Sequence, residues 1–227
     1  MRLYSVPVSN YCSKIRLIMA AKSLSFDELM PPDGYGSEAY KAVIPSGTIP
    51  GLIDGDVVLS ESTVIAEYLE EAYRIPPLMP ADVKDRAHVR LVNSFHDSRL
   101  EPVIRGLFGQ IDPAKRIQAQ VEGGAALWQS RLEDLERIVE PKPFIAGTSL
   151  SLADCAYPAT LLLAERMFAA LRVNAPLPRR LADWWAHIGT IETVESELRL
   201  YGEAVDAWIT RKLNESEAKD PTDEPRG

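Results

Sequence analysis

Residues 1–30, MRLYSVPVSNYCSKIRLIMAAKSLSFDELM, decide the fold of the first part of the chain. LYSV has the alternation of a β-strand, and FDELM has the pattern of a second strand. Between them, apolar residues at Ile15, Ile18 and Met19 have the spacing of one face of an α-helix. The stretch therefore predicts a β-α-β unit.

The turn that opens this helix, Ser9-Asn10-Tyr11-Cys12, has the spacing of a Cys-x-x-Cys redox motif with a hydroxyl in place of the leading thiol. Three interpretations are open: a disabled redox centre, a site for a thiol that a ligand supplies, and a helix cap. Because one cysteine cannot complete a two-cysteine cycle alone, we expect Cys12 to be buried and unreactive. Cys155 lies in an apolar segment, and we expect it in the core.

The following segments predict a hairpin and a helix. PGLIDGDVVLSES places Asp54-Gly55-Asp56 between two apolar runs, which is a strong signal for two strands joined by a tight turn. TVIAEYLEEAY then has helical spacing. Residues 1–80 are therefore predicted to form an α/β domain with the order βαβ-ββα, a small sheet covered by helices. IPPLMP, residues 75–80, contains three prolines and is the predicted linker between domains.

Residues 81–213 predict an all-helical bundle domain. The i, i+3, i+4 spacing of a helix recurs in DVKDRAHVRLVNSFHDSRLEPVIRGLF, PAKRIQAQVEGGAALWQSRLEDLERIV and SLADCAYPATLLLAERMFAAL, and PLPRRLADWWAHIG predicts a further helix. Ser151 to Asp154 forms a capping box, and the apolar helix that it opens is expected at the centre of the bundle. Pro158 would lie in the first two turns of that helix and bend it slightly at most. The polar residues 214–227 predict a disordered tail.

Composition excludes several classes of partner. The chain has 227 residues and a formal net charge of −8, which disfavours nucleic acid and anionic membrane surfaces, because dense Lys and Arg drive binding to both. No apolar run approaches the roughly 20 residues of a membrane span, and the N-terminus lacks the apolar core of a signal peptide, so we expect a cytoplasmic protein. The two cysteines and three histidines show no metal-binding spacing, and we expect no metal.

The order of elements and three motifs resemble the cytosolic glutathione S-transferase superfamily over nearly the whole chain. The motifs are SNYCSKIRL, with Ser9 at the position of the activating hydroxyl in serine-type (zeta, tau and theta-like) members, SGTIPGL, with Pro50 at the family's cis-proline, and Glu61-Ser62 before TVIAEYL. The Ser151 to Asp154 capping box also matches one in the family's bundle. The resemblance implies a thioredoxin-like N-terminal domain, an all-helical C-terminal domain, a homodimer, a role in detoxification, and glutathione as co-substrate.

The resemblance also implies roles for single residues at the glutathione site. Ser9 would donate a hydrogen bond that favours the thiolate, Asn10 would be a second donor, and Tyr11 is an alternative source of the hydroxyl. Ile49, before Pro50, would bind the cysteinyl backbone, and Glu61 with Ser62 would hold the γ-glutamyl end. Thr48 departs from the family, because many relatives place Lys or Gln there to reach the glycine carboxylate; Lys14 and Lys41 are candidate replacements.

The second substrate would bind between the domains. One wall would contain Val8 and Tyr11, and the first bundle helix would contribute Arg99, Arg105 and Phe108. Arginines in that wall would suit an electrophile that carries a carboxylate. The adjacent pair His96-Asp97 would lie near a dimer interface, where relatives place an acid that reaches a neighbouring glutathione.

Three functions compete at this stage. The first is a glutathione transferase that conjugates, isomerises or dehalogenates a small electrophile. The second is a thiol-disulfide reductase that uses Cys12, which Ser9 disfavours because it lacks the sulfur for a mixed disulfide. The third is a non-catalytic relative used for binding or regulation, which the joint presence of Ser9, Pro50, Glu61 and Ser62 disfavours.

Overall fold

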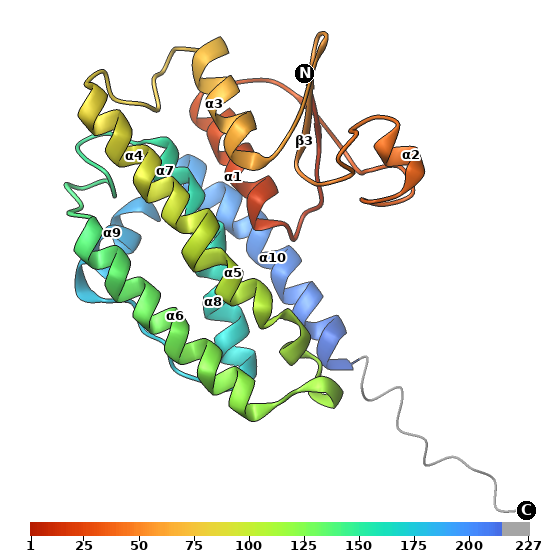
Figure 1. The fold of residues 1–227 in the computed structure, drawn as a ribbon, viewed down its shortest axis with the longest axis vertical. Helices are drawn as coiled ribbons and strands as arrows, with labels where there is room; N and C mark the ends of the chain where they lie inside the picture. Colours follow the sequence, from red (N-terminus) through yellow and green to blue (C-terminus); the bar gives the residue numbers. More distant parts are fainter. Residues whose placement is uncertain (215–227) are drawn as a thin grey trace, which may run out of the picture.

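The computed structural model describes residues 1–214, and it begins with a four-stranded sheet in the order β2-β1-β3-β4 (Figure 1). β1 pairs parallel with β2 and antiparallel with β3, and β3 pairs antiparallel with β4. The strands are β1 (Arg2–Tyr4), β2 (Asp27–Leu29), β3 (Gly51–Asp54) and β4 (Val57–Ser60); the helices of this part are α1 (Asn10–Ala21), α2 (Glu38–Lys41) and α3 (Ser62–Ala72). The predicted βαβ-ββα order is confirmed, and α2 adds one short helix to it.

The two faces of the sheet carry different apolar clusters because successive strand residues point to opposite sides. Leu3 and Leu52 belong to the main core, whereas Tyr4 packs with Tyr40 of α2 and with Ile44. α1 and α3 accordingly lie on the side that faces the helical part of the molecule, and α2 lies on the other side (Figure 1). The β3–β4 turn at Gly55, with φ +62°, confirms the predicted hairpin.

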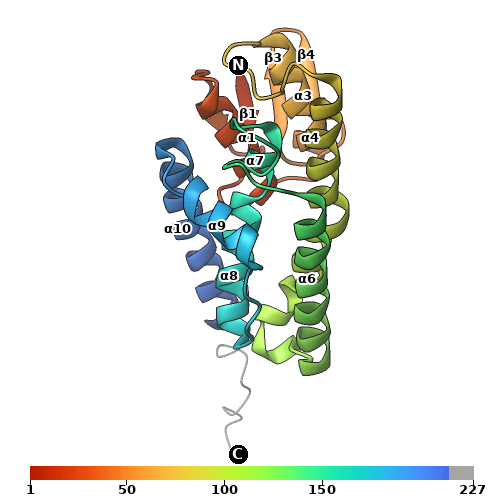
Figure 2. The same ribbon diagram turned by 90° about the vertical axis from the view of Figure 1, so that its left-hand side faces the viewer.

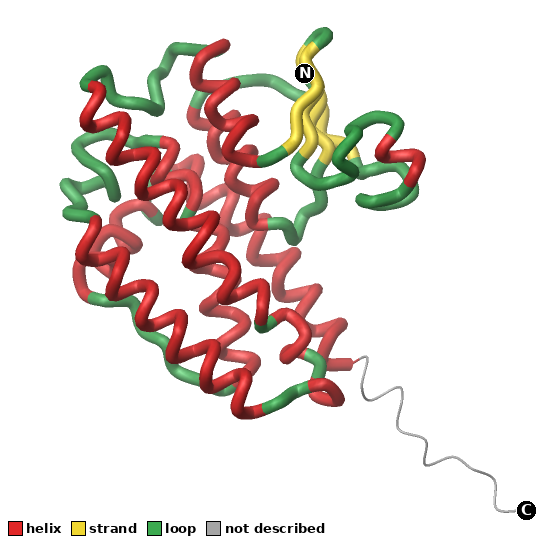
Figure 3. Tube along the Cα trace, viewed as in Figure 1, coloured by secondary structure: helices red, strands yellow, loops and turns green. Residues whose placement is uncertain are grey.

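The remainder of the described chain is helical (Figures 2 and 3). The α-helices are α4 (Val83–Phe95), α5 (Glu101–Gly106), α6 (Gln118–Ile138), α7 (Leu152–Ala156), α8 (Pro158–Leu171), α9 (Arg179–Ile188) and α10 (Glu192–Asn214), with a π-turn η1 (His96–Leu100) and short 3₁₀ turns η2 (Phe108–Ile111) and η3 (Pro113–Lys115). α8 is buried along most of its length, which confirms the predicted central helix. No helix of residues 1–214 is long and apolar enough to span a membrane.

Three expectations need correction. The first helix of the bundle is not continuous α-helix, because the π-turn η1 separates α4 from α5. The helix that the Ser151 capping box opens ends at Ala156, and α8 begins at Pro158, because proline lacks the N–H that would continue the ladder. The capping box itself is present. Asn214, assigned to the tail, is the last residue of α10; residues 215–227 lie outside the described residues.

The sheet part and the helical part share one apolar core. Buried residues of α1 such as Ile15 join the same cluster as Trp184 of α9. Residues 73–82 connect α3 to α4 and contain the predicted linker. The division at residue 80 into two domains stays a prediction, since the two parts bury each other's apolar surface.

Candidate functional site

A cavity of about 380 Å³ lies where the sheet part meets the helical part. Its lining comes from α1, from the segment before β3, from the start of α3, and from η1 and α5: Tyr11, Thr48, Ile49, Pro50, Glu61, Ser62, Thr63, Asp97 and Arg105. Two larger cavities, of about 550 and 560 Å³, lie elsewhere in the helical part and contain none of the sequence motifs. The smaller cavity is therefore the candidate site, and its volume is in the range of small-molecule sites.

The segment before β3 forms one wall of the cavity. The Ile49–Pro50 peptide bond is cis, as predicted from the motif SGTIPGL. Tyr40 of α2 fixes this segment, because its hydroxyl donates to the Thr48 carbonyl oxygen at 3.0 Å. A Cβ at Gly51 would lie 2.5 Å from the same Tyr40 hydroxyl, so the close approach requires glycine.

The N-terminus of α3 forms a second wall. Glu61 precedes the helix with φ +67°, an uncommon conformation for a residue other than glycine, which is often found at binding sites. Its side chain makes no capping hydrogen bond. The first N–H groups of a helix have no partner within the helix, so Ser62 and Thr63 present backbone donors and hydroxyls beside the cavity.

The N-terminus of α1 brings two hydroxyls to this region. Ser9 caps the helix, and its Oγ accepts a hydrogen bond from the Cys12 N–H at 3.3 Å. The Ser9 side chain is half-buried and is not among the residues that line the cavity. Tyr11 does line it, and the Cζ of Arg105 lies 5.5 Å from the centroid of its ring. Burial and the Glu101 carboxylate raise the pKa of Tyr11 well above its usual value, so its hydroxyl remains protonated.

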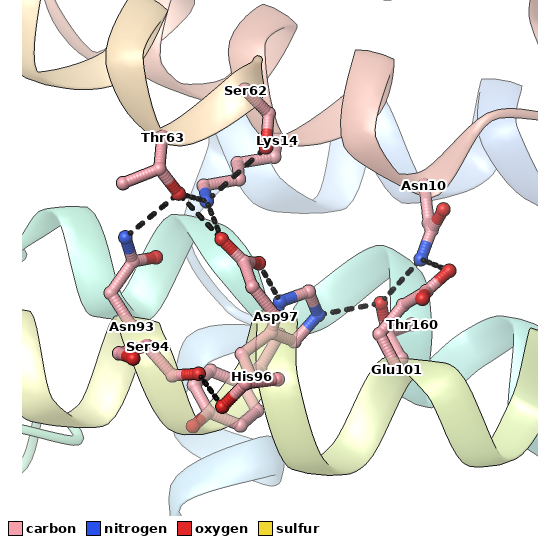
Figure 4. Close-up of polar contacts among 12 residues, drawn as sticks. Asn10, Lys14, Ser62, Thr63, Asn93, Ser94, His96, Asp97, Glu101 and Thr160 are labelled. Atoms are coloured by element: carbon pink, nitrogen blue, oxygen red, sulfur yellow. Dashed lines mark hydrogen bonds and ion pairs between the residues drawn. The ribbon is translucent and has the colours of Figure 1, made fainter.

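A polar cluster beside the cavity joins α1 and α3 to the π-turn η1 (Figure 4). The Lys14 side chain is 0% exposed, and its Nζ lies 3.0 Å from Thr63 Oγ1 and 3.3 Å from Asp97 Oδ2. Asp97 also bonds through Oδ1 to His96 Nδ1 at 2.7 Å. Burial opposes ionisation of Asp97, but hydrogen bonding from His96 and the charge of Lys14 outweigh it and hold the pKa of Asp97 well below its usual value.

The other ring nitrogen of His96 continues this cluster toward α1. His96 Nε2 lies 2.8 Å from Thr160 Oγ1, and Asn10 Nδ2 donates to the same oxygen at 2.9 Å. Glu101, at the start of α5, pairs with Arg105 at the edge of the cavity. Burial lowers the pKa of His96, so the imidazole is neutral near pH 7.

The structure brings together most, but not all, of the predicted site residues. Tyr11, Thr48, Ile49, Pro50, Glu61, Ser62 and Arg105 meet at the cavity. Ser9, the N-cap of α1, and Asn10, its first residue, are not among the lining residues. The Asn10 amide donates to Thr160 and Glu101 within the protein. Val8 packs against the core beside the same turn.

Two predicted residues of the first bundle helix do not reach this cavity. Arg99 lines the cavity of about 560 Å³ between α4 and α6. The reason is geometric, because Arg99 and Arg105 are six positions apart, which is not a whole number of helical turns. Phe108 packs on Trp208, with ring centroids 5.3 Å apart, and supports Arg105 instead of lining the cavity.

The two lysines considered as anchors for the glycine carboxylate, Lys14 and Lys41, form ion pairs within the protein and do not line the cavity. Lys41 pairs with Glu38 within α2 at 2.8 Å, and neither Lys41 nor Lys14 is among the lining residues. Cys12 is 0% exposed and Cys155 is buried. Burial raises the pKa of both thiols, which disfavours the thiolate and any reaction at these sulfurs.

Sequence reasoning missed Thr63, and it did not assign Asp97 to this cavity. The expectation that Asp97 lies near a dimer interface stays a prediction. Thr63 follows Glu61-Ser62 in the first turn of α3, so its position at a helix N-terminus was a usable signal. Asp97 offered no local signal, because its approach to Lys14 joins residues 83 positions apart. No group of His, Cys, Asp and Glu within residues 1–214 is arranged to hold a metal ion.

Comparison with known proteins agrees with this geometry. Residues 3–77 match the model of the glutathione S-transferase N-terminal domain. The chain is 32% identical over 164 residues to a stringent starvation protein A homolog of Pasteurella multocida, which covers 71% of this chain and 73% of that protein. It is 38% identical over 91 residues to glutathione S-transferase Z1 of Arabidopsis thaliana, which covers 38% of this chain and 41% of that relative.

A solved structure shows the same fold. The theta class glutathione S-transferase of Xanthomonas axonopodis pv. citri, determined with glutathione bound, superposes with a TM-score of 0.76 at 21% identity and covers 86% of this chain and 95% of that one. Fold and motifs thus define a thioredoxin-like domain joined to a helical bundle. The chain belongs to the glutathione S-transferase family.

Proposed function

We propose that this protein is a glutathione transferase, which binds glutathione in the cavity at Tyr11, Pro50 and Ser62 and transfers or uses its thiolate on a small electrophile. The observation that carries the proposal is that the cavity joins three features of a glutathione site: the cis-Pro50 segment, the uncapped start of α3, and the N-terminus of α1. Conjugation, isomerisation and dehalogenation all use this arrangement.

The two ends of glutathione suit different walls of the cavity. The γ-glutamyl carboxylate suits the N–H groups at the start of α3 and the Ser62 hydroxyl, since a helix N-terminus favours an anion. The Thr63 hydroxyl donates to Asp97 instead. The γ-glutamyl ammonium suits the carboxylates of Asp97 and Glu61, which line the same cavity. The cysteinyl backbone would pair with the backbone of Ile49. These placements bring the thiol toward α1.

Activation of the thiol is assigned to Ser9. A free thiol has a pKa of about 8.5, and a hydrogen bond together with a helix N-terminus would lower it by about one to two units, or about 1.4–2.7 kcal/mol. Capping uses a lone pair of Ser9 Oγ, so the hydroxyl proton remains available to donate to a thiolate. Tyr11 is the second candidate, because its protonated hydroxyl belongs to a residue that lines the cavity.

Two observations favour a second function. The relative matched over 73% of its length is a stringent starvation protein A homolog, and Ser9 is not among the cavity-lining residues. A glutathione-binding protein without transferase activity is therefore the alternative. The reductase that would use Cys12 is disfavoured by the burial of that thiol. A homodimer and a cytoplasmic location, which the family suggests, are part of the leading proposal.

Binding and turnover should be measured separately. We expect immobilised glutathione to retain the protein and the ultraviolet absorbance of the bound thiolate to rise. Turnover should be tested with a panel of aryl halides, epoxides, enones and maleyl compounds. Binding without turnover on any member of the panel would establish the alternative, and absence of binding would contradict both functions.

Substitutions at α1 then identify the activating group. Ser9→Ala should lower kcat/KM at least about tenfold, the effect of one hydrogen bond to an anion, and Tyr11→Phe should lower it less. Asp82→Ala is the control for the loss of a helix cap, because Asp82 caps α4 through side-chain bonds to backbone N–H groups and does not line the cavity. If Tyr11→Phe abolishes activity while Ser9→Ala does not, Tyr11 is the activating group. If Cys12→Ala alone abolishes it, the reductase is correct.

A further inference from the structure

Four side chains form a continuous hydrogen-bonded chain from the first turn of α1 to Asp97 at the cavity (Figure 4). Asn10 Nδ2 lies 2.9 Å from Thr160 Oγ1, Thr160 Oγ1 lies 2.8 Å from His96 Nε2, and His96 Nδ1 lies 2.7 Å from Asp97 Oδ1. Asn10, Thr160 and His96 are buried. These four residues are called the buried relay below.

The direction of each bond in the buried relay follows from its two ends. Asn10 Nδ2 also lies 3.4 Å from Glu101 Oε1, and because a carboxylate oxygen accepts, the amide nitrogen points there and donates to Thr160 Oγ1 as well. At the other end the Asp97 carboxylate only accepts, so His96 Nδ1 carries a proton and donates it. Burial favours the neutral ring, whose Nε2 then accepts the hydroxyl proton of Thr160.

The surroundings of His96 agree with a neutral ring in that tautomer. Its centroid lies 5.0 Å from the Tyr157 ring and 6.0 Å from the Tyr11 ring, and its side chain is 1% exposed. Burial lowers the pKa of His96, while the Asp97 carboxylate acts in the opposite direction. Lys14 Nζ lies against the other oxygen of Asp97. Burial lowers the pKa of Lys14, while the charge of Asp97 and its hydrogen bond act in the opposite direction.

The two ends of the buried relay lie at different parts of the proposed glutathione site. Asp97 lines the cavity beside Ser62 and Thr63, where the γ-glutamyl group is placed. Asn10 stands between Ser9 and Tyr11 in the turn that would activate the thiol. His96 and Asp97 both belong to the π-turn η1, a kind of helix irregularity that often occurs at functional sites.

We propose that His96 is a positioning residue, whose single ring holds the Asp97 carboxylate at the amino end of the bound glutathione and, through Thr160, holds Asn10 and the Ser9–Tyr11 turn at the thiol end. This inference rests on the proposed function. Nothing in it requires His96 to touch glutathione or to exchange a proton during the reaction.

Two substitutions separate the effects of the two hydrogen bonds that the His96 ring makes, to Asp97 and to Thr160. Asn carries its amide nitrogen near the position of Nδ1, so His96→Asn keeps the donor to Asp97 and loses the acceptor for Thr160. Gln reaches the position of Nε2, so His96→Gln keeps a partner for Thr160 and loses the donor to Asp97. We expect His96→Gln to raise the KM for glutathione about tenfold with a smaller change in kcat, and His96→Asn to lower kcat about tenfold with a smaller change in KM.

Thr160 provides a test that leaves the ring in place. Thr160→Val removes the hydroxyl with little change of shape and should reproduce the loss of kcat of His96→Asn, whereas Thr160→Ser restores the hydroxyl and should recover most of it. Ser98→Ala is the control within the same turn, because the Ser98 hydroxyl bonds only to the Ser94 carbonyl on the exposed side. Thermal unfolding of each variant separates loss of positioning from loss of fold.

The ring can also be observed without glutathione. ¹⁵N NMR of the histidine side chains of the unliganded protein should show His96 neutral and protonated on Nδ1 at neutral pH. Protonation on Nε2 instead, or a charged ring, would overturn the inference. The inference would also be overturned if the wild type binds glutathione and Thr160→Val has the same kcat and KM as the wild type. Failure of the wild type to bind glutathione would instead contradict the proposed function, and this inference with it.

Discussion

Lys14 of α1 and Lys22, the C-cap residue of that helix, both have fully buried side chains that face an acid, yet their surroundings differ. Lys22 Nζ lies 2.6 Å from Glu70 Oε2 and donates to the carbonyl oxygens of Tyr73 and Pro76 at 2.7 and 2.9 Å. The Glu70 carboxylate also accepts the N–H groups of residues 78 and 79 at 3.0 and 3.1 Å. This cluster is closed and ties the connection after α3 to α1.

The cluster at Lys14 is looser and open on one side. Its Nζ distances are 3.0 Å to Thr63, 3.3 Å to Asp97 and 3.5 Å to Ser62, and the Asp97 side chain is 26% exposed where it meets the cavity. A buried charge needs a counter-charge and hydrogen bonds wherever it lies. In the Lys22 cluster all the partners of the buried charges lie within the protein, and these contacts stabilise the fold. In the Lys14 cluster the Asp97 carboxylate is open to the cavity and can accept a hydrogen bond from a ligand.

The largest effect is expected in the closed cluster. Glu70→Ala leaves the Lys22 ammonium buried without its counter-charge and two backbone N–H groups without an acceptor, so it should lower the free energy of unfolding by about 3–5 kcal/mol. Urea denaturation measures this. A loss below about 1 kcal/mol would show that the cluster does not hold the connection after α3.

A smaller loss of stability is expected in the open cluster. Lys14→Met replaces the buried amine with an uncharged side chain of similar length. Asp97 keeps its bonds to His96 and Thr63 and its access to the cavity. We expect a loss of about 2–3 kcal/mol and a raised KM for glutathione, because Asp97 and Ser62 lose their common partner. A loss as large as that of Glu70→Ala would remove the distinction between the clusters.

The open cluster should also show a characteristic pH dependence. Because the folded pKa of Asp97 is held below the ordinary 3.8, its ionised form contributes stability that is complete above about pH 4 and is lost as the pH falls further. Asp97→Asn should therefore be less stable than wild type by about 1–2 kcal/mol at neutral pH, and the difference should shrink below about pH 4. Urea denaturation across this range tests it; a difference that closes between pH 7 and 5 would contradict the depressed pKa.

The smallest effect is expected at an exposed pair. Arg90 forms two bonds to Glu67, at 2.9 and 2.8 Å, with geometry as good as that of the buried clusters. Solvent screens this pair, so Arg90→Ala should change the free energy of unfolding by about 1 kcal/mol or less. A larger loss would mean that burial is not what separates the three pairs.

Local patterns predicted most of the fold because their causes lie within a few residues. Alternation and helical spacing identify β1, α1 and α3, and the pair Asp54-Gly55 identifies the hairpin. Two interruptions of helices were not predicted from the periodicity of apolar residues. Pro158 ends one helix and starts the next because proline lacks the N–H, and the π-turn η1 separates α4 from α5.

The candidate site divides along the same line. Residues within a contiguous motif, such as Thr48 to Pro50 or Glu61 with Ser62, meet at the cavity because each motif carries its own turn or helix start. Arg99 and Phe108 were assigned from one continuous helix and do not reach the cavity. The structure places Arg99 in η1 and Phe108 in η2, so the two residues do not share the register of Arg105 in α5.

The sequence by itself determined the order βαβ-ββα followed by helices and the capping box at Ser151. Its resemblance to the family added the cis-Pro50 turn and the segments that supply most of the site. Only the tertiary structure decided that Lys14 of α1 meets Asp97 of η1, and that Asn10 is joined through Thr160 and His96 to the same carboxylate. The physical reason is distance along the chain. Patterns of spacing report which face of an element is apolar, whereas the pairing of buried polar groups depends on which faces the shared core brings together.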